Sequence, residues 1–221
     1  MENKINFFFR YQIWHVGGTI ALFYIGYQFV NLNSNTNTFL GISALNWFII
    51  AMYVPLVHQV YTWICWRSEL CCKLISTSIG FKGYLIGFFI LIISRFSAVV
   101  LCFIDYGSLY KPGLLAWVLS IIIFIPGIYT MYSVKKYFGF IRAAGADHFD
   151  PKYRNMPFEK RGIFKWSSNA MYTYGIAIPF GFAIATGSQS MFIVSVYSYI
   201  SIWLHYFCTE KEDFKIIYGN N

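Results

Sequence analysis

Long apolar runs recur along this chain, and they limit its fold more than any other feature. Residues 11–30, 39–66, 83–104 and 113–132 are each long enough for a helix to cross about 30 Å of hydrocarbon at about 1.5 Å per residue. With 57% hydrophobic residues and a mean hydropathy of +0.52, a soluble globular core is untenable. We therefore expect an all-α, polytopic membrane helix bundle.

Two shorter apolar segments, residues 171–186 and 190–208, follow a long polar stretch. Only Gly-Ser-Gln separates them, and a connection that short predicts an antiparallel helical hairpin. Together with the four earlier runs, this gives about six crossings. We expect one integrated membrane domain, with a four-helix scaffold at residues 1–132 and a carboxy-terminal part at residues 133–221 made of a polar loop, the hairpin and an acidic segment.

The basic residues predict how the bundle is oriented. With the amino terminus in the cytosol, fifteen of the seventeen Lys and Arg residues lie on the cytosolic side, eight of them in or beside residues 137–166. The opposite face keeps only Lys111, and Arg95 lies inside a span. This asymmetry predicts cytosolic amino and carboxyl termini, in a bacterial inner membrane or the endoplasmic reticulum. It does not separate function classes, because any cytosolic membrane surface attracts basic protein.

Three polar residues inside the predicted spans have no obvious structural reason to be there. Arg95 is a functional candidate because intramembrane charges are rare, but its depth of roughly 18 Å from the cytosolic end of its span favours a structural polar contact. His58 and Gln59 lie nearer the cytosolic end of theirs. They either line a headgroup pocket or bond only to neighbouring backbone, and the sequence favours neither.

The cysteines give no sign of a metal site. They show no Cys-x-x-Cys spacing, and most of them lie within apolar runs. We therefore predict ordinary buried thiols, with neither a zinc site nor a disulfide framework. The five cysteines are Cys65, Cys71, Cys72, Cys102 and Cys208.

The polar stretch carries the residues best suited to chemistry. Gly139, Arg142, Gly145, Asp147 and His148 lie within ten residues of one another. Glycines let the backbone approach a ligand closely, and Asp beside His provides an acceptor and a nitrogen that titrates near neutral pH. The same letters also suit a plain helix end with a glycine cap, so this pattern alone leaves both interpretations open.

Three motifs follow one another in the last third of the chain. GADHF at residues 145–149 comes first, GIFKWSSNAMYTYG at residues 162–175 follows, and TEKEDFKIIYG at residues 209–219 comes after the hairpin. In this order, over about residues 137–219, they resemble the phospholipid N-methyltransferases and the related isoprenylcysteine carboxyl methyltransferases. The chain departs from the family pattern where Ala170 replaces a proline and Lys211 splits the acidic pair.

The resemblance implies S-adenosylmethionine as methyl donor and a lipid amine such as phosphatidylethanolamine, entering from the bilayer, as acceptor. It implies no nucleic-acid partner, and it leaves the oligomeric state open. Asp147 and His148 are the predicted catalytic pair, because the amine must lose a proton before it attacks. Trp166, together with Tyr172, is expected to lie against the adenine or the sulfonium. The predicted cofactor-binding residues are Gly139, Arg142, Gly145, Asn169, Met171, Tyr172, Glu210 and Glu212.

Two other functions remain as alternatives. A carboxyl methyltransferase of prenylated cysteine usually has Arg-His ahead of the motif tyrosine, where this chain has Ser168 and Asn169. A non-methylating membrane reductase or lipid-binding protein predicts no affinity for S-adenosylmethionine. Binding of that cofactor therefore separates the second alternative from both methyltransferases.

Overall fold

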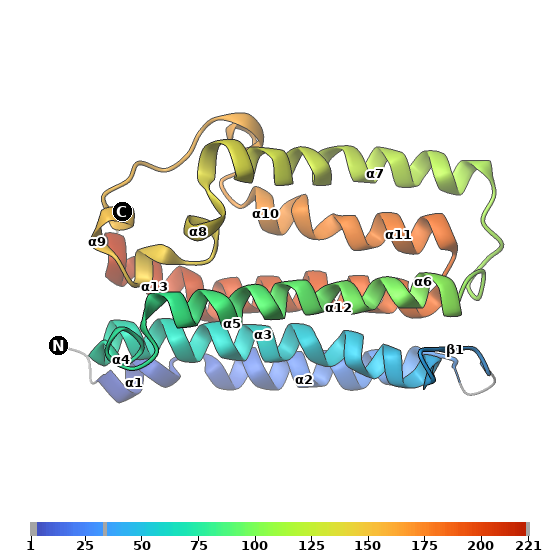
Figure 1. Cartoon of the computed structure of the whole chain (residues 1–221), viewed down its shortest axis with the longest axis horizontal. Coiled ribbons are helices and arrows are strands. Elements are labelled where there is room, and N and C mark those ends of the chain that lie inside the picture. Colours follow the sequence, from blue (N-terminus) through green and yellow to red (C-terminus); the bar gives the residue numbers. More distant parts are fainter. Residues whose placement is uncertain (1–3, 33–34, 220–221) are drawn as a thin grey trace.

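The computed structural model describes residues 4–32 and 35–219, and these are almost entirely helical (Figure 1). The strands in the described ranges are β1 and β2, two residues each, which form a short antiparallel hairpin after the second helix. The prediction of an all-α fold is confirmed. In chain order, with η marking 3-10 and π helices, the elements are α1 Lys4–Phe9, α2 Gln12–Phe29, β1 Thr38–Phe39, β2 Ile42–Ser43, α3 Ala44–Cys72, α4 Leu74–Thr77, α5 Gly80–Ser94, η1 Arg95–Val100, α6 Leu101–Ile104, α7 Leu114–Ser133, η2 Val134–Phe138, α8 Phe140–Ala143, η3 Ala146–His148, α9 Pro151–Arg154, η4 Gly162–Lys165, α10 Ala170–Thr173, η5 Gly175–Ala177, α11 Ile178–Thr186, α12 Gln189–His205, η6 Tyr206–Glu210 and α13 Lys211–Tyr218.

The long helices lie side by side along one axis, with α12 at the centre of the bundle. On one side α12 packs against α2 and α3, and on the other it packs against α11, its partner in the hairpin. α5 covers α3, while α7 covers α11 (Figure 1). The described amino-terminal and carboxy-terminal residues lie at the same end of the bundle, together with the short helices α4, α8 and α9.

Within residues 4–32 and 35–219, four helical segments are long and apolar enough to cross a membrane, and this makes the chain a membrane protein. They are Ala44–Cys72, Gly80–Ile104, Leu114–Phe138 and Gln189–Tyr218. Residues Gln12–Phe29 and Ala170–Thr186 run beside them, but length and composition do not place these two in the same class. The count of six crossings and the cytosolic termini therefore stay predictions.

Small residues allow α7 and α11 to approach closely. A Cβ atom on Gly127 would lie 2.5 Å from Cγ1 of Ile178, so only glycine is accommodated there. The Ser120 hydroxyl donates a 2.8 Å hydrogen bond to the carbonyl of Gly181 across the same interface. Close packing of small residues and hydroxyl bonds of this kind hold helices together where lipid removes the hydrophobic driving force. The opposite side of α7 carries exposed apolar residues: Ile121, Ile122, Ile125 and Ile128.

Two of the predicted spans differ from the expectation, one within its length and the other at its end. The third run is continuous but changes from α-helix to the 3-10 helix η1 at Arg95. The last run does not stop at Cys208, because the acidic segment continues it as η6 and α13. Both η6 and η2 are single π turns, an arrangement found frequently at functional sites. They bring the ends of two long helices to the same end of the bundle.

Candidate active site

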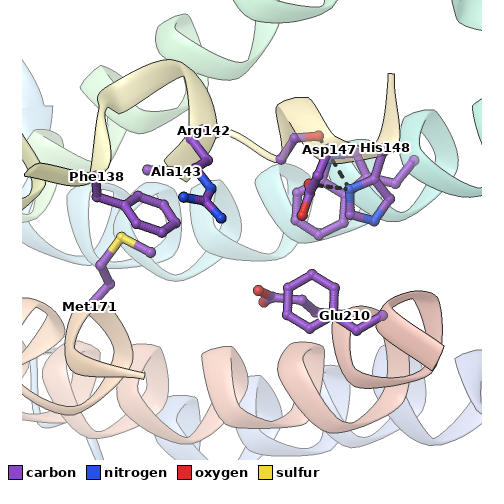
Figure 2. A pocket seen from close by; sticks show the side chains of 10 residues that line it. Phe138, Arg142, Ala143, Asp147, His148, Met171 and Glu210 are labelled. Carbon is purple, nitrogen blue, oxygen red and sulfur yellow. Dashed lines mark hydrogen bonds and ion pairs between the residues drawn. The ribbon is translucent and has the colours of Figure 1, made fainter. Parts of the chain in front are cut away.

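The polar loop and the end of the last long helix enclose a small pocket, shown in Figure 2. Its volume is about 40 Å³, and its walls come from seven separate elements and the turn at residue 145. Both aromatic and charged side chains line it, and the Glu210 carboxylate points into it (Figure 2). The lining residues are Trp66, Phe138, Arg142, Ala143, Gly145, Asp147, His148, Met171, Glu210 and Phe214.

Gly145 fixes the path of the polar loop past α3. Its φ of +80° is a left-handed conformation that favours glycine, and a Cβ atom there would lie 2.5 Å from the Trp66 ring. The indole of Trp66 donates to the Tyr84 hydroxyl at 2.7 Å, and that hydroxyl donates to the carbonyl of Ala144 at 2.6 Å. The loop is thus attached to α3 and α5. Gly145 also follows the end of α8 in the left-handed conformation, so the expected helix end with a glycine cap is present in the same segment.

His148 lies between two carboxylates at the wall of the pocket. Its Nδ1 is 3.1 Å from Oδ1 of Asp147, and its Nε2 is 3.3 Å from Oδ2 of Asp213. The second contact is an ion pair and not a well-aligned hydrogen bond. The imidazole stacks on Trp66, with ring centroids 4.2 Å apart and planes inclined by 17°. Its side chain is 1% exposed, so the ring has a single fixed position.

These contacts determine the charge of His148. Burial lowers the pKa of an imidazole, but the contacts with Asp147 and Asp213 and their negative charges outweigh burial and raise the pKa of His148 to about 9. Burial alone would raise the pKa of Asp147, yet its bonds with His148 and Tyr218 hold that pKa below its ordinary value. His148 is therefore an imidazolium near pH 7, which does not favour its predicted role as the base that takes a proton.

Asp213 and Arg67 hold this arrangement from behind, and sequence reasoning missed both roles. Arg67 Nε donates to Oδ1 of Asp213 at 2.9 Å, and both side chains are fully buried. The remaining guanidinium nitrogens of Arg67 donate to backbone carbonyls of α1, of the turn after it and of Cys208. Arg67 thus ties the amino-terminal end to the last helix, and it does not lie on the basic surface where its charge was counted.

Glu210 is the carboxylate with an available oxygen in the pocket. Its Oε2 accepts a short hydrogen bond from the hydroxyl of Tyr172, while both oxygens of Asp147 already accept bonds, from His148 and from Tyr218. The second oxygen of Glu210 has no recorded partner among the described residues. The prediction that the acidic segment faces the polar loop is met by Glu210.

Glu212, the second acidic residue predicted to bind the cofactor, does not face the pocket. Its carboxylate pairs with Arg10 at 3.3 Å and with Lys215 at 2.5 Å. Asp213, three residues after Glu210, takes the inward position instead. Residues three apart share a helix face, whereas residues two apart do not, so helical spacing was the signal that distinguishes Asp213 from Glu212.

The remaining predicted residues divide between the pocket wall and its surroundings. Arg142 and Met171 line the pocket, and Arg142 donates to the carbonyls of residues 156 and 157 at 3.2 and 3.1 Å, which holds the following loop. Gly139 and Asn169 begin the short helices α8 and α10 and are outside the lining. Trp166 is 70% exposed, packs near Tyr129 and is not among the residues that line the pocket, so the structure gives no support for its predicted contact with adenine.

Comparison with known proteins gives one family. A family model described as phospholipid methyltransferase matches residues 115–221, a range that begins upstream of the expected 137–219 and includes α7. Comparison with curated proteins and with solved structures gave no match. The matched range contains every pocket residue except Trp66. Residues 115–221 of this membrane protein are therefore similar to the phospholipid methyltransferase family.

Proposed function

We propose that this protein is an integral membrane methyltransferase that moves a methyl group from S-adenosylmethionine to the amine of a lipid such as phosphatidylethanolamine. The observation that supports it most is the available carboxylate of Glu210 in an aromatic pocket, inside the segment that matches the family. Both the sulfonium of the methyl donor and the ammonium of such a lipid are cations. A carboxylate and ring faces are the groups that bind cations.

The lining suits the methyl donor chemically. Trp66, Phe138 and Phe214 line the pocket with aromatic rings that suit a sulfonium or an adenine, and the backbone around Gly145 offers a close approach. The pocket of about 40 Å³ is small beside the roughly 300–1,000 Å³ typical of ligand sites. Binding therefore requires the pocket to widen, and the loop held by Arg142 over residues 156 and 157 is the segment we expect to move.

When bound, S-adenosylmethionine supplies an electrophilic methyl group on a positively charged sulfur. The protein must align the lipid amine with the methyl group on the side opposite the sulfur, since in-line displacement depends on alignment. It must also remove a proton, because an amine with an ordinary pKa near 10 is protonated at pH 7. His148 already carries a proton and faces two carboxylates. We assign proton removal to the free oxygen of Glu210.

His148 and Asp147 then act as positioning residues. Their contacts with Asp213 and Tyr218 join the polar loop to α13, so the loop and Glu210 keep one relative position. Tyr172 does the same from α10, by its bond to Glu210. The positive charge of His148 lies near the pocket wall and offsets the nearby carboxylates.

The experiment is methyl transfer by the purified protein in lipid nanodiscs, with labelled S-adenosylmethionine and a panel of phospholipids. We expect label in phosphatidylethanolamine and a turnover that rises between about pH 6.5 and 9, because the neutral amine becomes more abundant. A carboxylate substrate is already ionised over that range. Binding of the cofactor with no transfer to any amine lipid would contradict the proposal, and no binding at all would favour a non-methylating protein.

A further inference from the structure

A second polar cluster lies inside the bundle, away from the pocket lining, and centres on Arg95. This residue begins η1, where the helical run Gly80–Ile104 changes its winding. Its guanidinium Nε and Nη2 are buried and have no hydrogen-bond partner among the residues that the structure describes. The structural polar contact predicted for Arg95 is therefore wrong. A mid-helix 3-10 turn with an unsatisfied charge is more typical of a functional position.

The groups around Arg95 are unsatisfied in the same way. His58, Tyr197 and His205 are 6%, 2% and 3% exposed, and each has a buried polar atom with no partner in the described part of the chain, as does the hydroxyl of Ser97. η1 packs against α3 and α12, the two helices that carry His58, Tyr197 and His205, and the charge of Arg95 acts on all three side chains. Leaving a buried polar group unpaired is unfavourable, and a cluster of such groups indicates a ligand.

The missing partner is an anion. Two buried carboxylates that could have served as a counter-charge are bonded to other groups. Asp105 caps the start of α12 through Ser188 and Ser190. Glu69 accepts hydrogen bonds from Ser76. Removing water from a guanidinium without supplying a counter-charge is strongly unfavourable. The hydroxyls of Tyr197 and Ser97 add neutral donors to the charged ones, and such a set suits an anion with several oxygens.

The cluster is connected to the pocket. The charge of Arg95 also acts on Tyr172, the residue whose hydroxyl is bonded to Glu210. His205 links the two regions as well, because its ring lies 5.5 Å from the ring of Trp66 in the pocket wall. An anion at Arg95 and a cation at Glu210 would thus both interact with the surroundings of Tyr172.

Depth does not exclude a lipid headgroup from this position. α3 has 29 residues and is about 43 Å long, which exceeds the roughly 30 Å of hydrocarbon. Its charged residues, Arg67 and Glu69, lie in its last turns. The part of α3 that extends beyond the hydrocarbon is therefore at the end of the bundle that carries the pocket. Arg95 is therefore closer to the headgroup region than its roughly 22 Å from the start of α5 indicates.

Protein does not cover Arg95 completely. It is half-buried as a residue, although its Nε and Nη2 atoms are buried. Within the described part of the chain, α5 packs on α3 and α7 packs on α11, with no extended contact between α5 and α7. A lipid that approached between these two helices would therefore not have to break an extended helix–helix contact.

We infer that Arg95, with Tyr197 and Ser97, binds the phosphodiester of the lipid substrate and so places its amine at Glu210. The inference rests on the proposed function for the identity of the lipid. It adds binding residues outside the segment that matches the family, since Arg95 and Ser97 precede residue 115, while Tyr197 lies within that segment. Phosphate recognition at Arg95 would make the enzyme selective for phospholipids over other amphiphilic amines.

The test measures binding of a lipid that cannot be methylated, so it does not depend on turnover. The probe is lysophosphatidylglycerol, which has a phosphodiester and no amine, compared with a monoacylglycerol of the same chain and with a fatty acid. The variants are Arg95→Met, Arg95→Lys and Tyr197→Phe, with Lys82→Met as the matched control, because Lys82 is in the same helical run outside the cluster. Thermal unfolding in detergent checks that each variant is folded.

We expect the wild-type protein to bind the phosphodiester at least tenfold more tightly than the monoacylglycerol. Arg95→Met should remove that preference, Arg95→Lys should keep part of it, Tyr197→Phe should weaken it about threefold, and Lys82→Met should not change it. If Arg95→Met does not fold, an unchanged preference in Tyr197→Phe overturns the site. A preference that survives Arg95→Met, or a fatty acid that binds more tightly than the phosphodiester, also overturns it.

Methyl transfer in the same preparations separates the two proposals. Arg95-dependent phosphodiester binding without transfer to any lipid amine would end the proposed function and leave the anion site standing. Transfer to phosphatidylethanolamine that is the same in wild type and Arg95→Met would end the anion site and leave the function standing. If both hold, Arg95→Met should lose at least tenfold in kcat/KM for phosphatidylethanolamine, while its kcat/KM for a phosphate-free long-chain amine stays within threefold.

Discussion

Nε2 of His148 lies 3.3 Å from Oδ2 of Asp213, and this contact joins the polar loop of the pocket to the last helix of the chain. Because Asp213 is paired on its other side with the buried Arg67, the charge on His148 is part of a network that spans three segments far apart in the sequence. The stability of the folded protein should therefore depend on pH.

The pKa of His148 is raised from 6.5 to about 9 in the folded protein. A raised pKa means that the folded state holds the proton more tightly, so the stabilisation is complete below about pH 6.5 and is lost as pH rises through about 9. We expect the thermal unfolding temperature in detergent to fall between these values. His148→Gln should be less stable at pH 6.5 and should show a flatter pH profile, and an equal slope in both proteins would contradict the network.

Asp213→Asn should destabilise the protein far more than Glu212→Gln. The first substitution leaves Arg67 buried without its counter-charge, which typically costs about 3–5 kcal/mol. Glu212 pairs with the partly exposed Arg10 and Lys215, and such pairs are worth about 0–1 kcal/mol. Denaturant titration in micelles measures the difference. Similar losses for both variants would contradict the distinction between a fully buried ion pair at Asp213 and pairs with partly exposed cations at Glu212.

Glu210→Gln separates two roles for this carboxylate. If Glu210 takes the amine proton, turnover should fall about 10²- to 10⁴-fold, with less than a tenfold change in the affinity for S-adenosylmethionine. The sequence-based prediction of a cofactor contact gives the opposite pattern, since a lost charged partner of about 1.5–3 kcal/mol lowers affinity roughly tenfold or more. Calorimetry with the cofactor and initial rates with lipid decide between them, and Glu212→Gln is the control outside the pocket.

Orientation can be tested with single cysteines in a background without the native ones. Thr36 lies in the loop between α2 and α3, and Asn155 lies in the basic loop beside the pocket; both are exposed. The distribution of Lys and Arg predicts that Thr36→Cys reacts with an impermeant thiol reagent added outside intact cells, whereas Asn155→Cys reacts only after lysis. The reverse labelling would place the pocket on the other face of the membrane.

The sequence predicted local features well and long-range pairing poorly. The apolar runs predicted the helices, because a helix is the simplest way to satisfy backbone groups in lipid. The motif order placed Arg142, Asp147, His148, Met171 and Glu210 together. Helical periodicity in the acidic segment favours Glu210 and Asp213, which are three residues apart, as the pair on one face over Glu210 and Glu212, which are two apart.

Other features had no local signal. The bond between Arg67 and Asp213 joins residues 146 positions apart, and nothing near Arg67 in the sequence distinguishes it from the surface cations around it. Arg95 was identified as unusual, but whether a protein partner satisfies it depends on side chains from α3 and α12 that only the folded bundle brings near. Pairings of this kind follow from tertiary packing and not from local pattern.

The most direct test of the proposed activity is a competition between two acceptors for one methyl donor. Purified protein in nanodiscs receives labelled S-adenosylmethionine with equal amounts of phosphatidylethanolamine and a farnesylated cysteine, and the products are separated by chromatography. We predict that the label appears as an N-methyl group on the phospholipid. Label recovered as a base-labile methyl ester of the prenylated cysteine, with none on the amine, would contradict the assignment of a lipid amine as the substrate.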